Sequence, residues 1–429
     1  MRTFNASLCF VLVVCTLLPA SMSRGDELAV LRAGVAKVDI TPKKPVKMAG
    51  YASRQGLSTG VHDPLSARVL AFECGDKRLV LVSTDLIGFY GGTAEFLREA
   101  ILREFDLEPA ELFLSAIHTH AGPSLTLDKE KGHPHNLEYT LALKDTLIEA
   151  IRAARKSLEA VTIGTGVGHC PVGGNRRQLR ITAKGDSSIV LGRNPDGITD
   201  KEVLVMKVAR ADGAPLVVAF DYATHGTSLG GKNYTVSGDV IGLAEQFVEK
   251  IFGPETTAPA FAGASGNIDP WFRVLPAFNT EPGWVPEPVL LGTFLGEEVV
   301  HVCRGIAGAS SATDLNCGFA TLELPPKPSE EDSAGDNPDP VPFNVTVARL
   351  GDIAFVGLGG EVLTEIGLAI KAGSPCAHTF VITHCNGAAG YLAPKELHVE
   401  GGYEIRSTHF APQAAEVVVR RALAMLHGL

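Results

Sequence analysis

The stretch RLVLVSTDLIGFYGGTAEFLREAILREFDLEPAELFLSAIHTH (residues 78–120) decides the fold class. Its first part, 78–89, is a continuous apolar run of strand type, and 92–105 places apolar residues at helical intervals between charged ones. A second strand-type run follows at 111–120. A strand, a helix and a strand in this order are typical of sheets that are layered with helices. The stretch therefore predicts an α/β core.

The flanking sequence extends this pattern in both directions. An alternating strand is predicted at 33–42 and a long amphipathic helix at 136–159. Within 202–225, two apolar runs separated by Ala-Asp-Gly-Ala predict an antiparallel hairpin, so we expect mixed β-sheets layered with helices. Further elements follow from the same patterns: helices at 240–252, 289–306, from about Glu361, and near 411–427, and strands at 343–350, 353–358 and 378–384.

One segment differs in composition from the rest of the chain. Residues 324–342 (LPPKPSEEDSAGDNPDPVP) are rich in proline and acidic residues, which predicts an exposed excursion or a linker. The elements predicted after it are too few to form a second core. We therefore predict one large domain over residues 25–429.

Composition and charge exclude some functions. The chain has 429 residues, a hydrophobic content of 45% and a net charge of −10 without a basic cluster, which argues against binding to nucleic acid or anionic lipid. Arg2 precedes the apolar run SLCFVLVVCTLL (7–18), and small residues follow it. This is the pattern of a signal peptide, predicted over 1–24, so we expect an exported protein, periplasmic or secreted. No later stretch has transmembrane length.

A pair of histidines ends the second strand of the opening stretch. His118 and His120 are two residues apart, and side chains alternate along a strand, so both should point to one face. Two imidazoles on one face indicate a metal site or a proton shuttle. A pair of hydrogen-bonded structural histidines would give the same pattern, and these residues alone leave both explanations open.

Other candidate residues follow strands elsewhere. His225 ends the run 217–225, in the place where α/β folds carry active sites, although a structural histidine would fit there too. Glu361 follows a strand and a Gly-Gly turn and is predicted to open a helix, where the helix dipole favours an anion. The Gly-rich segment 383–404 carries two tyrosines and two histidines, and a loop of this length predicts function.

A set of motifs, in this order, resembles the catalytic domain of the neutral/alkaline non-lysosomal ceramidases, from about residue 33 to the C-terminus. Each motif is weak alone, and the ordered set is specific. The motifs are AGVAKVDITP (33–42), MAGYASR (48–54), GVHDPLSARVLAF (60–72), VLVSTDL (80–86), IHTHAGP (117–123), GGNRR (173–177), DKEVLVMKV (200–208), ATHGTS (223–228) and GEVLTEIG (360–367).

The resemblance implies a site and an activity. Family members bind one catalytic zinc ion through two histidines, a glutamate and a tyrosine, and the matching positions are His118, His225, Glu361 and Tyr391. The residues that match the lining of the reaction centre are His120, Arg176 and Tyr403. The implied function is that of an exported zinc-dependent amidohydrolase. It would cleave a small-molecule or lipid amide of N-acylsphingosine type to a fatty acid and an amine.

The chain departs from the family pattern at two places. Asp269, in GNIDP (266–270), stands where the family has a serine, so Asp269 is a candidate general base or extra ligand, or else caps the turn before Pro270. The sequence also ends soon after the predicted closing helix, so we expect the family's C-terminal β-sandwich domain to be absent. Two alternatives stay open: a zinc hydrolase of a different amide or ester, and a non-catalytic domain that binds a lipid or glycan.

Overall fold

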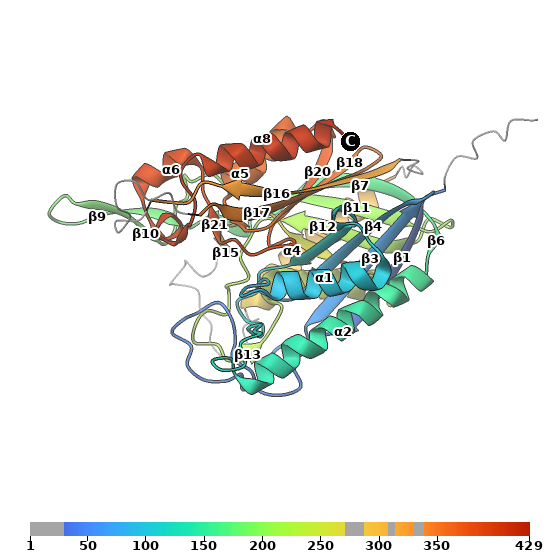
Figure 1. The fold of residues 1–429 in the computed structure, drawn as a ribbon, viewed down its shortest axis with the longest axis horizontal. Coiled ribbons are helices and arrows are strands. Elements are labelled where there is room, and N and C mark those ends of the chain that lie inside the picture. The colour runs from blue at the N-terminus through green and yellow to red at the C-terminus, as the bar shows by residue number, and fades with distance from the viewer. Residues whose placement is uncertain (1–29, 271–286, 308–313, 329–338) are drawn as a thin grey trace, which may run out of the picture.

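The computed structural model describes residues 30–270, 287–307, 314–328 and 339–429 (Figure 1). The predicted signal peptide, 1–24, lies outside these residues. Three main sheets form the fold. The first is a mixed sheet of five strands, and the second and third are mixed sheets of four strands each. The α/β class with mixed sheets is confirmed.

The first sheet has the strand order β5-β4-β3-β1-β6. Its strands are β1 (Arg32–Asp39), β3 (Ser66–Cys74), β4 (Lys77–Thr84), β5 (Leu112–Ala116) and β6 (Glu159–Ala160). Strands β4 and β5 are parallel and are joined by helix α1 (Thr93–Phe105), as the opening stretch predicts. Helix α1 and helix α2 (Pro134–Lys156) cover one face of the sheet.

The second sheet has the order β14-β12-β11-β7. Its strands are β7 (Thr162–His169), β11 (Glu202–Ala209), β12 (Pro215–Tyr222) and β14 (Ala260–Ala262). The predicted hairpin is formed by β11 and β12, which pair antiparallel. Helices α3 (Asp239–Phe252) and α4 (Glu287–Gly305) pack on its outer face.

The third sheet has the order β16-β17-β18-β20, and helices α5 and α8 cover it. Its elements are β16 (Leu315–Leu324), β17 (Val341–Leu350), β18 (Ile353–Leu358), α5 (Thr364–Gly373), β20 (His378–Ile382) and α8 (Ala414–His427). Leu324 pairs with Val341, so the acidic segment 324–342 joins two paired strands and is not a linker between domains. Its residues 329–338 lie outside the described part.

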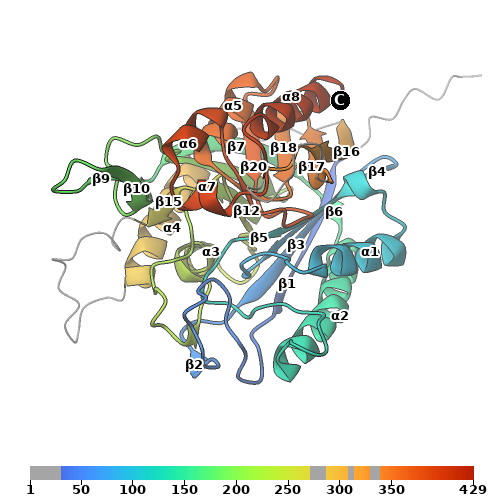
Figure 2. The same cartoon turned by 60° about the vertical axis from the view of Figure 1, so that its left-hand side comes forward.

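The inner faces of the three sheets share one core. Phe72 of β3, Met206 of β11 and Phe380 of β20 belong to the same buried cluster, while the outer face of each sheet packs against its own pair of helices. Figure 2 shows the strands enclosed by helices in this way. Both faces of strands such as β4 are therefore buried, which explains the continuous apolar run at 78–89.

Several short elements lie outside the three main sheets. These are β2 (Gly60–Val61) paired with β13 (Thr235–Val236), β8 (Gly173–Asn175) with β15 (Ile268–Pro270), β9 (Arg177–Ile181) with β10 (Ser187–Leu191), and β19 (Glu361–Val362) with β21 (Tyr391–Leu392), together with the short helices η1 (Pro109–Glu111), α6 (Lys395–Glu400) and α7 (Tyr403–Ser407). Among the described helices, none is long and apolar enough to cross a membrane.

Candidate functional site

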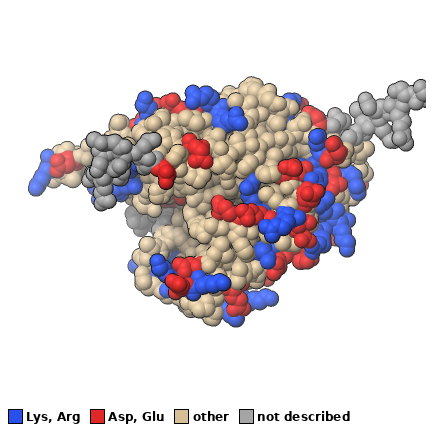
Figure 3. Space-filling model, in the orientation of Figure 1, with Lys and Arg blue, Asp and Glu red and all other residues tan. Residues whose placement is uncertain are grey.

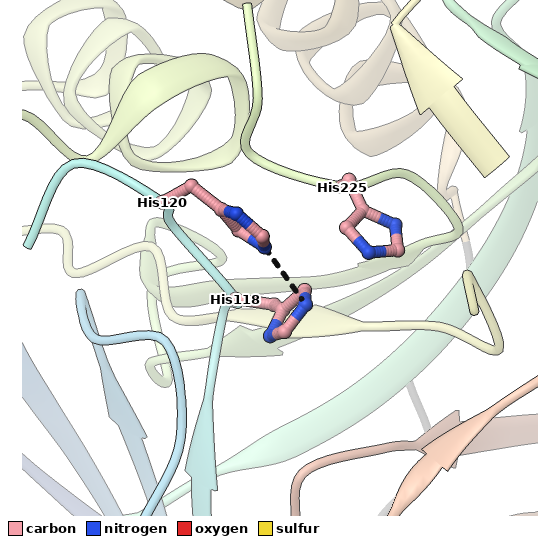
Figure 4. A group of neighbouring side chains, drawn as sticks. All are labelled: His118, His120 and His225. Carbon is pink, nitrogen blue, oxygen red and sulfur yellow. Dashed lines mark hydrogen bonds between the residues drawn. The ribbon is translucent and has the colours of Figure 1, made fainter. Parts of the chain in front are cut away.

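Three imidazoles meet at the ends of the first and second sheets. His118, His120 and His225 place ligand nitrogens within 4.8 Å of one another (Figure 4). The Nε2 atoms of His118 and His120 are 3.2 Å apart, and His225 faces them from the segment that follows β12. His118 and His225 are buried, and His120 is half-buried. Such a cluster could hold a metal ion.

The backbone at His118 brings this cluster together. The predicted strand 111–120 is too long: β5 ends at Ala116, and His118 adopts a φ of 62°, in the left-handed region. Thr119 then forms a bridge with Gly226, and the amide of His120 donates to the Gly226 carbonyl at 2.8 Å. The two histidines thus share a centre because the chain bends, not because strand residues alternate. A left-handed buried non-glycine residue is the kind of local strain that gathers at functional sites.

Each of the three rings is oriented by a backbone carbonyl. In every case Nδ1 donates to a main-chain oxygen, which leaves Nε2 as the atom that can accept or ligate. This is the arrangement that orients metal-binding histidines. The contacts are His118 Nδ1 to Ile87 O at 2.6 Å, His120 Nδ1 to Gly50 O at 3.2 Å, and His225 Nδ1 to Ser265 O at 2.8 Å and Ile268 O at 2.9 Å.

Gly50 permits the close approach of the segment 48–54 to His120. Its φ is +98°, and a Cβ atom there would lie 2.4 Å from the His120 Nδ1. The neighbouring Tyr51 ring packs edge-on against the His120 imidazole at a centroid distance of 5.3 Å. The Met-Ala-Gly-Tyr motif therefore forms one wall around His120.

Glu361 and Tyr391 lie in the same site. The prediction that Glu361 opens a helix is wrong, because α5 begins at Thr364 and Glu361 is in β19, directly opposite Tyr391 of β21. Glu361 Oε1 lies 3.0 Å from His225 Nε2 and 3.4 Å from His118 Nε2. The Tyr391 phenol hydrogen-bonds to the Glu361 carboxylate. The structure thus gathers the four residues predicted as metal ligands.

The protonation states suit a divalent cation. Burial lowers the pKa of both His120 and His225, which keeps these rings neutral near pH 7. Burial alone would raise the pKa of Glu361, but His118 and His225 hold it well below its usual range, so the group is a carboxylate. Ligand atoms at tetrahedral zinc lie about 3.3 Å apart, given Zn–N bonds of about 2.0–2.1 Å. The separations of 3.0–3.4 Å around Glu361 match that spacing.

Arg176 connects the histidine cluster to Asp269. One guanidinium nitrogen of Arg176, Nη1, lies 3.2 Å from His225 Nε2 and 3.4 Å from Asp269 Oδ1, and the other, Nη2, donates to the Tyr391 hydroxyl at 3.1 Å. The Thr227 hydroxyl donates to Asp269 Oδ1 at 3.1 Å. Asp269 is therefore part of the site and not a remote turn cap.

Two residues of the site were not predicted from the sequence. Glu404 is buried and accepts from Arg176 Nε and Arg177 Nη1, at 2.8 Å each, which fixes the Arg176 guanidinium. The buried His384 ring stacks on His118, with centroids 3.9 Å apart and planes 9° apart. The only signal for them was the segment 383–404, which contains His384 and ends at Glu404.

A cavity of about 420 Å³ opens onto this cluster. His120, Arg176, Asp269 and Tyr391 line it, and Tyr403 lies at its mouth with 40% of its surface exposed. The Tyr403 and Tyr391 rings meet edge to face at 5.7 Å. The arrangement offers a candidate cation site, a guanidinium, a carboxylate and a phenol to one bound molecule.

Comparison with known proteins links the chain to one family. Residues 31–269 match the family model described as neutral/alkaline non-lysosomal ceramidase, N-terminal. Neutral ceramidase B of Dictyostelium discoideum is 28% identical over 262 residues, which cover 57% of this chain and 35% of that protein. Neutral ceramidase 1 of Arabidopsis thaliana is 26% identical over 241 residues, 53% of this chain and 30% of that protein. The matches thus span about a third of the length of these relatives.

Solved structures share the fold over almost the whole chain. The crystal structure of neutral ceramidase from Pseudomonas aeruginosa superposes with a TM-score of 0.76 at 19% identity, covering 94% of this chain and 75% of that one. A ceramidase complexed with C2 superposes with a TM-score of 0.75 at 18% identity, covering 94% and 76%. This likeness of fold includes most of the chain beyond residue 269, where the family match ends.

Proposed function

Because this chain belongs to the neutral/alkaline non-lysosomal ceramidase family, we propose that it is a metal-dependent hydrolase that cleaves an N-acyl amide to a fatty acid and an amine. The observation that carries the proposal is the convergence of His118, His225 and Glu361 at ligand spacing beside a cavity. Relatives of similar sequence are named neutral ceramidases, which supports an amide of N-acylsphingosine type as the substrate.

We assign the metal as zinc, held by His118, His225, Glu361 and Tyr391. Nitrogen ligands from imidazole and oxygen ligands from a carboxylate and a phenol suit this ion. A zinc ion bound there would lower the pKa of a water molecule to about 7 and so would supply a nucleophile at neutral pH.

The other residues of the site would move protons and stabilise charge. Asp269 takes a proton from the attacking water as the new C–O bond forms, and passes it to the nitrogen as the C–N bond breaks, which releases the amine. The Arg176 guanidinium and the Tyr403 phenol stabilise the negative charge on the amide oxygen. His120, which lines the cavity next to His118, contacts the substrate.

Asp269 also favours a second candidate function. In this family a serine stands at the matching position, and a carboxylate there adds a negative charge beside Arg176. A site rebuilt around that charge would select a different amide, or an ester, while keeping the metal. Substrate profiling decides between the two candidates.

The test combines metal analysis with turnover. Purified protein should contain about one zinc ion per chain, and His118→Ala or His225→Ala should lose it, because each removes a ligand. His120→Ala should keep most of the zinc but lose hydrolysis of fluorogenic N-acyl amides. His169→Ala, at an exposed histidine of β7, is the matched control.

Three outcomes would contradict parts of this proposal. Full zinc retention in His118→Ala would remove the ligand assignment, and zinc loss in His120→Ala alone would exchange the roles of the two histidines. Zinc without turnover of any amide or ester in the panel would support a non-catalytic domain that binds a lipid or glycan.

We also propose that the chain is exported and that residues 25–429 form a single domain. The apolar run at 7–18 after Arg2 supports the first point. N-terminal sequencing of the protein from an exported fraction should give a first residue near 25, and retention of Met1 would contradict export. One cooperative unfolding transition is expected for a single domain.

A further inference from the structure

The β9–β10 hairpin projects from the body of the molecule and has two different faces (Figure 1). Directly opposed residues of an antiparallel pair share a face. The pairs Leu179–Ile189 and Ile181–Ser187, with Leu191 beside them, make one face mostly aliphatic. The other face is largely polar and is formed by Gln178, Arg180, Ser188 and Val190.

Within the part of the chain that the structure describes, most of the aliphatic face is uncovered. Leu179, Ile181 and Leu191 expose 58%, 66% and 52% of their surface, whereas Ile189 is half-buried and lies against the start of α7. A two-stranded ribbon cannot bury an apolar face by itself. Aliphatic side chains gathered on a projecting ribbon mark a surface that contacts something else.

Both ends of the hairpin lie at the catalytic cavity. Arg176 immediately precedes β9, and the amide of Gly192, after β10, donates to the Arg176 carbonyl at 2.8 Å. Leu191 lines the cavity itself. The base of the hairpin is held by Arg177, the first residue of β9, which donates to the Glu404 carboxylate at 2.8 Å. Any surface that receives the aliphatic face therefore lies next to the cavity mouth.

We propose that this face of the hairpin docks on the surface of a zwitterionic lipid bilayer and presents the cavity to an amide held there. The proposal rests on the proposed function, because it concerns how that site reaches a lipid substrate. Apolar side chains of interfacial anchors insert between lipid headgroups, and Leu179, Ile181 and Leu191 could do the same. Because these side chains lie beside the cavity, docking through them would bring the cavity close to a substrate in the bilayer.

The size of the face argues against a second copy of the chain as its partner. Three aliphatic side chains bury on the order of 100 Å² each, by the usual relation between area and transfer energy. A stable protein interface needs roughly 800 Å² from each partner. The face alone supplies well under half of that area.

The charges argue for neutral headgroups. The chain has a net charge of −10, and acidic and basic side chains are interspersed over the face drawn in Figure 3. On the hairpin, Arg180 and Lys184 are accompanied by Asp186. The sequence contains no basic cluster that would favour anionic lipid.

The experiment measures binding of the whole protein to phosphatidylcholine vesicles by co-sedimentation. Leu179→Glu/Ile181→Glu should weaken binding at least about tenfold, because charged side chains do not enter the bilayer. Val167→Glu/Ile251→Glu, at residues that are 50% and 43% exposed, is the matched control and should bind as the wild type does. Thermal unfolding should stay unchanged in both variants, since the substituted side chains are exposed.

Activity separates this proposal from the proposed function. The hairpin variant should hydrolyse a soluble short-chain N-acyl amide at the wild-type rate and lose rate only on the same amide embedded in vesicles. Three results would overturn the docking while leaving the hydrolase intact: no vesicle binding by the wild type, binding to anionic vesicles alone, or equal loss of binding in the control variant. A dimeric mass in solution that the hairpin substitutions abolish would assign the face to self-association instead.

Discussion

At the scale of single residues, Asp269 separates the two candidate functions. Its Oδ1 accepts from Thr227 and Arg176 at the wall of the cavity, so its carboxylate can take a proton from a water beside the histidine cluster. Asp269→Asn should lower kcat/KM by about 10²–10⁴, the usual size of general-base catalysis, while zinc content stays the same. Asp76→Asn, at a carboxylate 88% exposed, is the control.

A second substitution at the same position tests the substrate. Asp269→Ser restores the residue that the family resemblance implies. Gain of activity on N-acyl sphingoid amides would show a ceramidase with an altered base, whereas loss of the native reaction with no such gain would show another substrate class. Wild-type kinetics in Asp269→Asn would mean that this carboxylate takes no part in the reaction.

At the scale of elements, the segment 384–386 closes the open edge of the first sheet. Strand β5 is the last strand of that sheet, and the buried Asn386 side chain bonds to its backbone as a neighbouring strand would. The amide accepts from Leu114 N at 3.0 Å and donates to Leu112 O at 2.6 Å and to Thr346 Oγ1 of β17 at 2.9 Å. One side chain thus joins the first sheet to the third.

We predict that Asn386→Leu destabilises the protein and weakens metal binding together. Losing these bonds leaves buried backbone groups of β5 unpaired, at a cost of about 1–3 kcal/mol for each. Because the segment also holds His384 against His118, the zinc affinity should fall as well. Urea unfolding and zinc titration measure the two effects, with Asn316→Leu on β16 as the control. Lower stability with unchanged zinc affinity would show that the segment only supports the sheet.

The helices and strands also show which structural details local sequence patterns predict and which they do not. Helix α2 was predicted at 136–159 and spans Pro134–Lys156, because its apolar spacing is a local property. Glu361 was predicted at a helix start, but its pairing with Tyr391, thirty residues away, places it in a strand. The left-handed bend at His118 depends on Gly226 in the same way. Contacts between distant segments decide these details, and no local pattern encodes them.

Other features of the site were even harder to predict from the sequence. Glu404 is recognisable only by its two arginine partners, which come from β9 and the residue before it. The β9–β10 hairpin was not predicted, although the alternation of Leu179 and Ile181 with polar residues is typical of a strand. Arg176, Tyr391 and Tyr403 were predicted as site residues from the family resemblance, because periodicity gives no signal for them.

At the scale of the whole molecule, a buried carboxyl group makes stability depend on pH. Asp221 lies in β12, and its Oδ2 accepts from Val381 N of β20 at 3.1 Å. Its Oδ1 has no hydrogen-bond partner within the described part of the chain. Burial raises the pKa of Asp221 to about 7, against the opposing effect of Lys371. The folded state therefore holds this proton more tightly than the unfolded state, whose pKa is about 3.9.

A carboxyl group whose pKa is higher in the folded state makes the protein less stable as the pH rises. The contribution of Asp221 to stability is fully present below about pH 4 and is lost as the pH rises through 7, by up to about 4 kcal/mol. The free energy of unfolding of the wild type should thus fall between pH 4.5 and 8 relative to Asp221→Asn. Urea unfolding across this range measures it, and Asp145→Asn, at an exposed carboxylate, is the control. Parallel pH profiles for the wild type and Asp221→Asn would contradict the raised pKa.

The site residues are far apart in the sequence, which determines the order in which they become available during synthesis. His118, His120 and His225 follow strands of the first two sheets, whereas Glu361 of β19, Tyr391 of β21 and Tyr403 of α7 come later in the chain, among the elements of the third sheet. During synthesis the imidazoles precede their acidic and phenolic partners by more than a hundred residues. An ion captured early would meet an incomplete set of donors, and the proposed set would be complete only after β19 and β21 have paired. Because a ligand stabilises only the state that binds it, the metal would secure the finished fold and leave nascent chains unprotected.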